Sequence, residues 1–152
     1  METGCEPPRI VAGMPMYNEE ETIGTVVTMA LRHVDEVICI DDGSSDSSAR
    51  IAEACGATVI RHRGNQGYGA ALKTLFKTTR DSDTDVLVVL DSDGQHDTKD
   101  IPKLIQPILD EEADFKIVSS FVEGVEGNDM PAYRRLGIKV ITESIVKLNK
   151  EI

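Results

Sequence analysis

Short apolar runs alternate with longer segments of helical period along this chain, and this alternation is what most limits its possible folds. The runs are continuously apolar, which favours strands that are covered on both faces. Between them, apolar residues recur three and four positions apart, as on the buried side of a helix. The predicted strands cover residues 10–12, 37–40, 57–60, 86–90 and 115–118.

Helical stripes separate and follow these strands. Asn18 and Glu21 have the spacing of a capping box before the first stripe, and Gly56 is placed to end the second. Pro107 is expected to kink the fourth, and a further stripe predicts a last helix over 133–149. The stripes are Ile23, Val26, Val27, Ala30, Leu31 and Val34; Ile51, Ala52 and Cys55; Ala71, Leu72, Leu75 and Phe76; Ile101, Leu104, Ile105, Ile108 and Leu109; and Ile138, Ile141, Ile145 and Leu148.

The repeated order of strand, helix and strand predicts a doubly wound α/β domain with a mostly parallel sheet. A single domain over 1–152 suits the length. The last predicted helix has no later element to pack against, so we expect a fragment that lacks further C-terminal elements. Ligands of such sheets bind beyond the carboxyl ends of the strands, which directs attention to the loops that follow them.

Composition excludes several classes of protein. The formal net charge of −11 argues against a nucleic-acid binder. The N-terminus lacks the layout of a signal peptide, and no apolar run approaches the length of a membrane span. We therefore expect a cytoplasmic chain, soluble or peripheral on the cytoplasmic face of a membrane. The odd number of cysteines, without metal-ligand spacing, predicts reduced structural thiols.

The sequence VLDSDGQHD follows directly from the fourth apolar run. Asp91 and Asp93 supply hard oxygen ligands that suit Mg²⁺ or Mn²⁺, completed by phosphate oxygens and water. They would equally suit an acidic cluster at the start of the next helix. An EF-hand is excluded, because His96 stands where that loop needs Gly and Pro102 where it needs Glu.

Two other enzyme classes use an acidic loop of this kind. In an aspartyl-nucleophile phosphatase, Asp91 would attack phosphorus and Asp93 would act as acid and base. The earlier acidic pair, Asp41 and Asp42, and the Gln95 after Gly94 count against this class. A sugar-phosphate nucleotidyltransferase would need a Gly-rich first loop with a basic residue, whereas this chain has the acidic MPMYNEE.

Taken together, the loops resemble the family 2 inverting glycosyltransferases, especially the polyprenyl-phosphate (dolichyl-phosphate) mannosyltransferase branch. That resemblance implies the Rossmann-like A-type glycosyltransferase fold. The five motifs that carry it, in the family's order, are Pro15-x-Tyr17-Asn18-Glu19-Glu20, Asp41-Asp42-Gly43-Ser44-Ser45-Asp46, Asn65-x-Gly67-x-Gly69-Ala70-Ala71, Asp91-x-Asp93-x-Gln95-His96 and Met130-Pro131-x-Tyr133-Arg134-Arg135-x-Gly137.

The resemblance implies a nucleotide pocket built from the first two loops. Pro15, Tyr17 and Glu19 would line the nucleobase and ribose pocket, and Asp41 and Asp42 would contact base or ribose. Asn18 remains a helix-cap candidate beside this role.

The third and fourth loops would hold the diphosphate and the metal. Gly67 would let the backbone approach the nucleotide, and Lys73 would reach a diphosphate unless it is only a solvated helix residue. By resemblance, Asp91 contacts nucleotide or metal, Asp93 ligates the ion and Gln95 completes the site. His62, between two arginines, is interpreted as a surface residue rather than a catalyst.

The last motif bears on the acceptor. Arg134 and Arg135 match basic residues that the polyprenyl-phosphate branch uses near donor or acceptor phosphates, and they also suit the first turn of a surface helix. Ser120 stands where the family commonly has an arginine.

The resemblance therefore implies metal-dependent transfer of a hexose to a polyprenyl or dolichyl phosphate with inversion. The donor would be a nucleoside-diphosphate sugar, most plausibly GDP-mannose or UDP-glucose, with Asp91, Asp93 and Arg134 at the catalytic centre. A phosphatase and a non-catalytic nucleotide-binding module remain the alternatives, and the oligomeric state is open.

Overall fold

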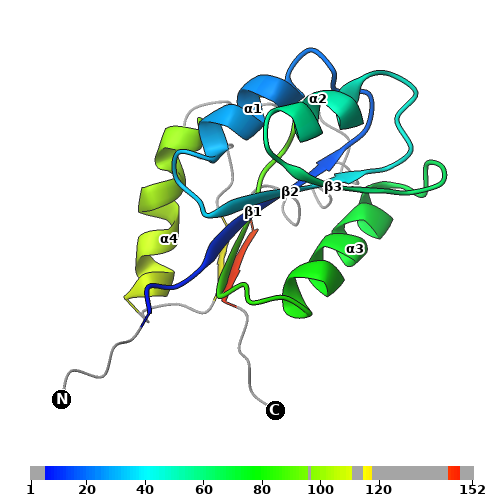
Figure 1. Ribbon diagram of the computed structural model, residues 1–152. Coiled ribbons are helices and arrows are strands. Elements are labelled where there is room, and N and C mark those ends of the chain that lie inside the picture. Colours follow the sequence, from blue (N-terminus) through cyan, green and yellow to red (C-terminus); the bar gives the residue numbers. More distant parts are fainter. Residues whose placement is uncertain (1–5, 96, 111–114, 118–143, 148–152) are drawn as a thin grey trace, which may run out of the picture.

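A computed structural model of the chain describes residues 6–95, 97–110, 115–117 and 144–147, and the account below concerns these residues. They form a sheet flanked by helices (Figure 1). The elements are β1 Ile10–Met16, α1 Ile23–Ala30, β2 Glu36–Asp41, α2 Ser48–Ala54, β3 Thr58–Arg61, α3 Tyr68–Arg80, β4 Val86–Val89, the short 3₁₀ helix η1 Thr98–Asp100, α4 Ile101–Leu109, β5 Phe115–Ile117 and β6 Ser144–Lys147.

The sheet confirms the predicted doubly wound, mostly parallel topology. Its strand order is β3-β2-β1-β4-β6-β5. β1 pairs in parallel with both β2 and β4, and β2 with β3. β6 runs antiparallel to both β4 and β5, so it is the one reversed strand among those described. The order reverses direction beside β1, because β2 and β3 lie on one side of it and β4 on the other.

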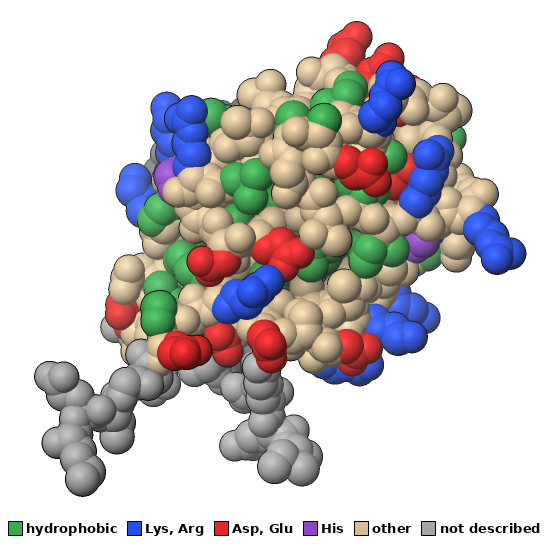
Figure 2. Space-filling model, viewed as in Figure 1, with side chains coloured by type: hydrophobic (Ala, Val, Ile, Leu, Met, Phe, Trp, Pro, Cys, Tyr) green, Lys and Arg blue, Asp and Glu red, His purple; other side chains and the backbone are tan. Residues whose placement is uncertain are grey.

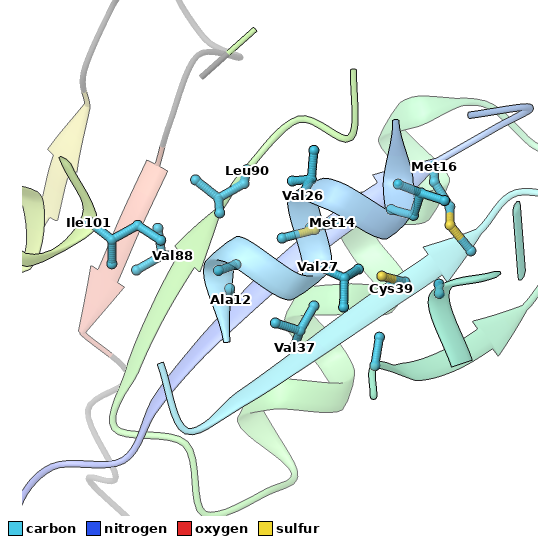
Figure 3. Packing of buried hydrophobic residues seen from close by; sticks show 14 of the residues in the cluster. Ala12, Met14, Met16, Val26, Val27, Val37, Cys39, Val88, Leu90 and Ile101 are labelled. Atoms are coloured by element: carbon cyan, nitrogen blue, oxygen red, sulfur yellow. The ribbon is translucent and has the colours of Figure 1, made fainter. Parts of the chain in front are cut away.

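Helices cover both faces of this sheet, as the continuous apolarity of the strands predicts. Alternate residues of β1 divide between two cores. Ala12, Met14 and Met16 pack with residues of α1, α2 and α4 (Figure 3). Val11 belongs to the second core, which α3 covers through Ala71 and Leu75.

Gly13 lets α3 lie directly against β1. A Cβ atom at this position would be 2.3 Å from Cδ2 of Leu75 and 2.6 Å from its Cδ1, far inside van der Waals contact. The absence of a side chain at Gly13 therefore leaves the space that the buried Leu75 side chain of α3 occupies.

Most predicted boundaries hold within a few residues. β1 extends four residues beyond the predicted 10–12, through Gly13 and Pro15. Gly56 follows the C-cap of α2 with φ of 100°, a left-handed conformation that confirms its predicted role as a stop. α4 continues past Pro107 to Leu109.

The predicted capping box is wrong. The N-cap of α1 is Thr22, and no side chain caps the helix there. The Asn18 side chain instead accepts a hydrogen bond from the backbone N–H of Ser45, at 2.9 Å, because a long-range partner in the loop after β2 lies within reach. The predicted last helix is also wrong over Ser144–Lys147, which form β6; its other residues lie outside the described ranges.

The described cysteines, Cys39 and Cys55, are free thiols, as predicted. Burial and the nearby Asp41 raise the pKa of the Cys39 thiol to about 12, which keeps it protonated and unreactive. Over the described part of the chain, no helix combines the length and apolarity needed to cross a bilayer. Figure 2 shows side chains of both charge signs spread over one face of the molecule.

Candidate functional site

An open cleft of about 310 Å³ lies at the carboxyl ends of the parallel strands. Loops that follow β1, β2, β3 and β4 all contribute to it, so it sits where the strand order reverses beside β1, the usual ligand position in such sheets. Its lining residues are Pro15, Met16, Tyr17, Glu19, Asp42, Asn65, Gly67, Tyr68, Ala71, Asp91, Ser92 and Asp93.

Asp42 joins the loop after β2 to the loop after β3. Its side chain is 6% exposed. Oδ1 accepts hydrogen bonds from Nδ1 of His62 at 2.7 Å and from the backbone N–H of Gln66 at 3.0 Å. Oδ2 accepts from the backbone N–H of Gly67 at 2.7 Å. We call this arrangement of Asp42, His62, Gln66 and Gly67 the Asp42 clasp.

The clasp keeps Asp42 ionised. Burial alone would raise the pKa of this carboxyl, but hydrogen bonds from the Gln66 amide, the His62 ring and the Gly67 amide, together with electrostatic attraction to His62, lower it below the ordinary 3.8. A lowered pKa in the fold means that ionisation of Asp42 stabilises the folded state above the unfolded-state pKa. That contribution is lost as the pH falls through the lowered folded value.

Acid unfolding should therefore report on Asp42. We expect the free energy of unfolding of the wild type to fall as the pH drops below about 4, and Asp42→Asn to show a shallower dependence there. Urea unfolding at a series of pH values measures both. The exposed Glu53 on α2 provides the control, because Glu53→Gln should keep the wild-type slope. Equal slopes for Asp42→Asn and the wild type would contradict this assignment.

Asp91 follows β4, which lies on the other side of β1 from β2, and it also lines the cleft. The hydroxyl of Tyr68, in the first turn of α3, donates a hydrogen bond of 3.3 Å to Oδ1 of Asp91. Burial, together with Asp91, raises the pKa of this phenol well above its usual range, so it stays a donor at any physiological pH. Beside it, the hydroxyl of Ser92 donates to the carbonyl oxygen of Pro15 at 3.1 Å, which ties the ends of β4 and β1 together.

Removing this hydroxyl tests whether Tyr68 orients Asp91. We expect Tyr68→Phe to keep the fold, because the half-buried ring remains, and to weaken the metal-dependent nucleotide binding that the resemblance implies by roughly ten- to a hundredfold, as for the loss of one hydrogen bond to a charged group. Calorimetric titration of a nucleoside diphosphate with and without Mn²⁺ measures the change. Unaltered affinity in the presence of Mn²⁺ would show that the hydroxyl does not position Asp91.

Asp93 also lines the cleft, and its Oδ1 accepts a hydrogen bond of 3.0 Å from the backbone N–H of Gln95. The structure does not bring the Gln95 side chain together with the two carboxylates. Gln95 is exposed and borders a separate hollow, which also involves Asp97 and the outer side of α1.

The donor set of the cleft suits a divalent ion that is shared with a ligand. Among the described residues, no group of three or more His, Cys, Asp or Glu side chains could hold a metal by itself. Mg²⁺ is commonly held by one or two carboxylates while substrate phosphates and water complete its shell. Asp91 and Asp93 fit that arrangement, with phosphate oxygens supplied by the ligand.

Two other predicted site residues lie away from the cleft lining. Asp41 is fully buried, where its Oδ2 lies 3.1 Å from Nε of Arg61 and its Oδ1 accepts from the backbone N–H of Ser44. Lys73 is exposed on α3, beside a shallow hollow that also involves Leu72 and Phe76. Arg134 falls outside the described residues, so its predicted role stays a prediction.

The structure also adds residues that the sequence reasoning did not select. Tyr68 and Ser92 line the cleft, and His62 supports it from behind through Asp42. The sequence holds a signal for Tyr68, because this residue lies between two glycines of the third motif, at the start of a helix that follows a strand. The interpretation of His62 as a surface residue is wrong, because its side chain is only 10% exposed. Its partners, Asp42 and Thr74, are distant in sequence, so the residue spacing gave no signal for these contacts.

The fold and the cleft define an α/β protein with an acidic ligand cleft at the point where its strand order reverses. The family model of glycosyl transferase family 2 matches residues 12–150, and the chain belongs to this family.

Curated relatives that cover most of this chain support this assignment. A UDP-N-acetylglucosamine--dolichyl-phosphate N-acetylglucosaminyltransferase of Methanococcus voltae is 31% identical over 142 residues, covering 82% of this chain and 57% of the relative. A dolichol-phosphate mannosyltransferase of Pyrococcus furiosus is 33% identical, covering 81% of this chain and 36% of the relative. An uncharacterized protein of Methanocaldococcus jannaschii is 35% identical, and the match covers 82% of this chain and 51% of that relative. The chain thus spans about half the length or less of these curated relatives.

Solved structures share the fold. Glucosyl-3-phosphoglycerate synthase of Mycobacterium tuberculosis in complex with UDP is 26% identical with a TM-score of 0.68, covering 93% of this chain and 57% of that one. The same enzyme in complex with Mn²⁺, UDP-glucose and phosphoglyceric acid is 23% identical with a TM-score of 0.69, over the same shares of both chains, and shows the fold alone.

Proposed function

We propose that this chain carries the nucleotide-sugar site of an enzyme that transfers a hexose to a polyprenyl or dolichyl phosphate with inversion. The donor would be GDP-mannose or UDP-glucose, and the reaction would depend on Mg²⁺ or Mn²⁺. The observation that carries the proposal is the placement of Asp91 and Asp93 in the cleft of a family 2 chain. The acceptor class is supported by the names of the M. voltae and P. furiosus relatives.

In this reaction, an oxygen of the acceptor phosphate attacks the anomeric carbon and forms the new C–O bond. The bond from that carbon to the donor diphosphate breaks, and the nucleoside diphosphate leaves with the electron pair. Because a phosphate oxygen is already anionic at neutral pH, the protein needs to position the two reactants more than it needs a strong base.

The cleft residues would divide this work by location. Asp91 and Asp93 would hold the divalent ion, which supplies positive charge to the leaving diphosphate. Pro15, Tyr17 and Glu19 would line the base and ribose, and Tyr17 is well suited because its side chain is exposed at the cleft. Arg134 would act at the phosphates, and the site of transfer would face a membrane surface where the acceptor resides.

The proposal is tested by incubating the full-length protein with Mn²⁺, polyprenyl phosphate and radiolabelled GDP-, UDP- and dTDP-sugars in turn. We expect label to enter the lipid fraction with one of these donors and to stay in the aqueous fraction when EDTA is added. Metal-dependent nucleotide binding without any transfer would refute the enzyme and support a non-catalytic module. Phosphate release from small phosphomonoesters would instead support the phosphatase.

A further inference from the structure

His62 links three structural elements from a nearly buried position. Its side chain is 10% exposed. Nδ1 lies 2.7 Å from Oδ1 of Asp42, and Nε2 lies 2.9 Å from Oγ1 of Thr74 on α3. Its backbone N–H donates to the carbonyl oxygen of Asp41 at 2.8 Å, so the main chain at His62 is held as well. The ring therefore links the end of β3 to the end of β2 and to α3.

Asp42 is nearly saturated by the protein. A carboxylate offers about four acceptor positions, and His62, Gln66 and Gly67 occupy three of them. Little capacity remains for a ligand. The geometry thus gives Asp42 a role beside the predicted contact with base or ribose, because its oxygens hold the turn at Gln66 and Gly67.

That turn leads directly into the cleft. Gly67 lines it and is followed by Tyr68, whose hydroxyl donates a hydrogen bond to Asp91, another lining residue. A carboxylate that is free to rotate cannot accept hydrogen bonds from both amides at once. Because His62 fixes the orientation of Asp42, it also fixes the Gln66–Gly67 turn, which contributes Gly67 to the cleft lining.

We propose that His62 is a positioning residue for nucleotide binding, acting through Asp42 to hold the Gln66–Gly67 turn. The inference rests on the proposed function for the nucleotide, whereas the clasp itself can be measured without any ligand. In this role, the N–H at Nδ1 donates a hydrogen bond to Asp42, and the contact of Nε2 with Thr74 fixes the plane of the ring from the other side.

The test uses three substitutions that separate the two ring nitrogens. Asparagine places an amide N–H near the position of Nδ1 and glutamine near that of Nε2, whereas alanine removes both. We expect His62→Ala and His62→Gln to speed hydrogen exchange at the amides of Gln66 and Gly67 by roughly tenfold or more, and His62→Asn to stay close to wild type. The matched control is His33→Ala, at a half-buried histidine that follows α1 and lies outside the cleft lining.

Nucleotide affinity gives the second measurement. We expect His62→Ala and His62→Gln to raise the Kd for a nucleoside diphosphate by roughly tenfold in EDTA as well as in Mn²⁺, while His62→Asn restores it. Unchanged amide exchange in His62→Ala would overturn the clasp whether or not the protein is a transferase. Faster exchange with an unchanged Kd would overturn the positioning role. If the wild type binds no nucleotide, the proposed function and this role both fail, although the exchange data still decide the clasp.

Discussion

Asp93→Asn is expected to abolish metal-dependent nucleotide binding while leaving the fold intact. The substitution removes the charge, yet an asparagine side-chain oxygen can still accept the 3.0 Å hydrogen bond from the Gln95 amide. A loss of binding can therefore be assigned to the missing metal ligand rather than to a rearranged turn. We expect the affinity measured in Mn²⁺ to fall by about a hundredfold, toward the value in EDTA, and any transfer activity to fall at least as far.

The neighbouring Asp97 supplies a close control. Its Oδ1 accepts a hydrogen bond of 3.0 Å from the backbone N–H of Lys99, a turn of the same kind, but it is exposed and does not line the cleft. Asp97→Asn should leave nucleotide binding unchanged in calorimetric titrations with and without Mn²⁺. Retention of full Mn²⁺ dependence in Asp93→Asn would refute the metal assignment.

Gly43→Ala is expected to give the largest loss of stability among substitutions near the cleft. Gly43 has φ of 80°, and a Cβ atom there would lie 2.7 Å from the Cα of Gly64 and 2.9 Å from the backbone N of Asn65. Because these are backbone atoms, the clash cannot be relieved by a change of rotamer. The left-handed conformation and the overpacking together should lower the free energy of unfolding by about 2–4 kcal/mol.

Denaturant unfolding measures this effect, and Gly69→Ala is its control. Apart from its chain neighbours and the backbone of its own helix, no described atom lies within 4 Å of a Cβ at Gly69, in the first turn of α3. Alanine there should therefore be neutral or stabilise by up to about 1 kcal/mol. If the loop after β3 moves and so relieves the clash, Asn65 moves with it, because it lies in that loop and lines the cleft. In that case the stability should stay near the wild-type value and the nucleotide affinity should fall. Wild-type values for both would contradict the close approach of the two loops.

The parallel part of the fold could be predicted because each strand there is buried on both faces and each helix on one. Such burial leaves continuous and periodic apolar patterns in the sequence. β6 could not be predicted in this way. Ile145 belongs to a stripe of helical period, but residues 144–147 pair with both β4 and β5, and that tertiary pairing outweighs the local pattern.

The sequence likewise predicts some residues of the candidate site and misses others. Asp91 and Asp93 could be predicted because a sequence of carboxylates after a strand places them at one edge of the sheet. The capping box at Asn18 failed, and the support from His62 was missed, for a common reason: both side chains find partners in another loop, at Ser45 and Asp42. Sequence spacing gives no information on such contacts when the pairs are about twenty or more residues apart.

The packing of α3 against β1 at Gly13 bears on the geometry of the cleft, although Gly13 lies in the core. α3 lies on β1 at Leu75, while the first turn of the same helix carries Tyr68 to Asp91. A larger residue at position 13 would push against the Leu75 side chain and so displace α3 from the sheet. We expect this displacement to lengthen the hydrogen bond between Tyr68 and Asp91, and so to change the cleft through a substitution in the core.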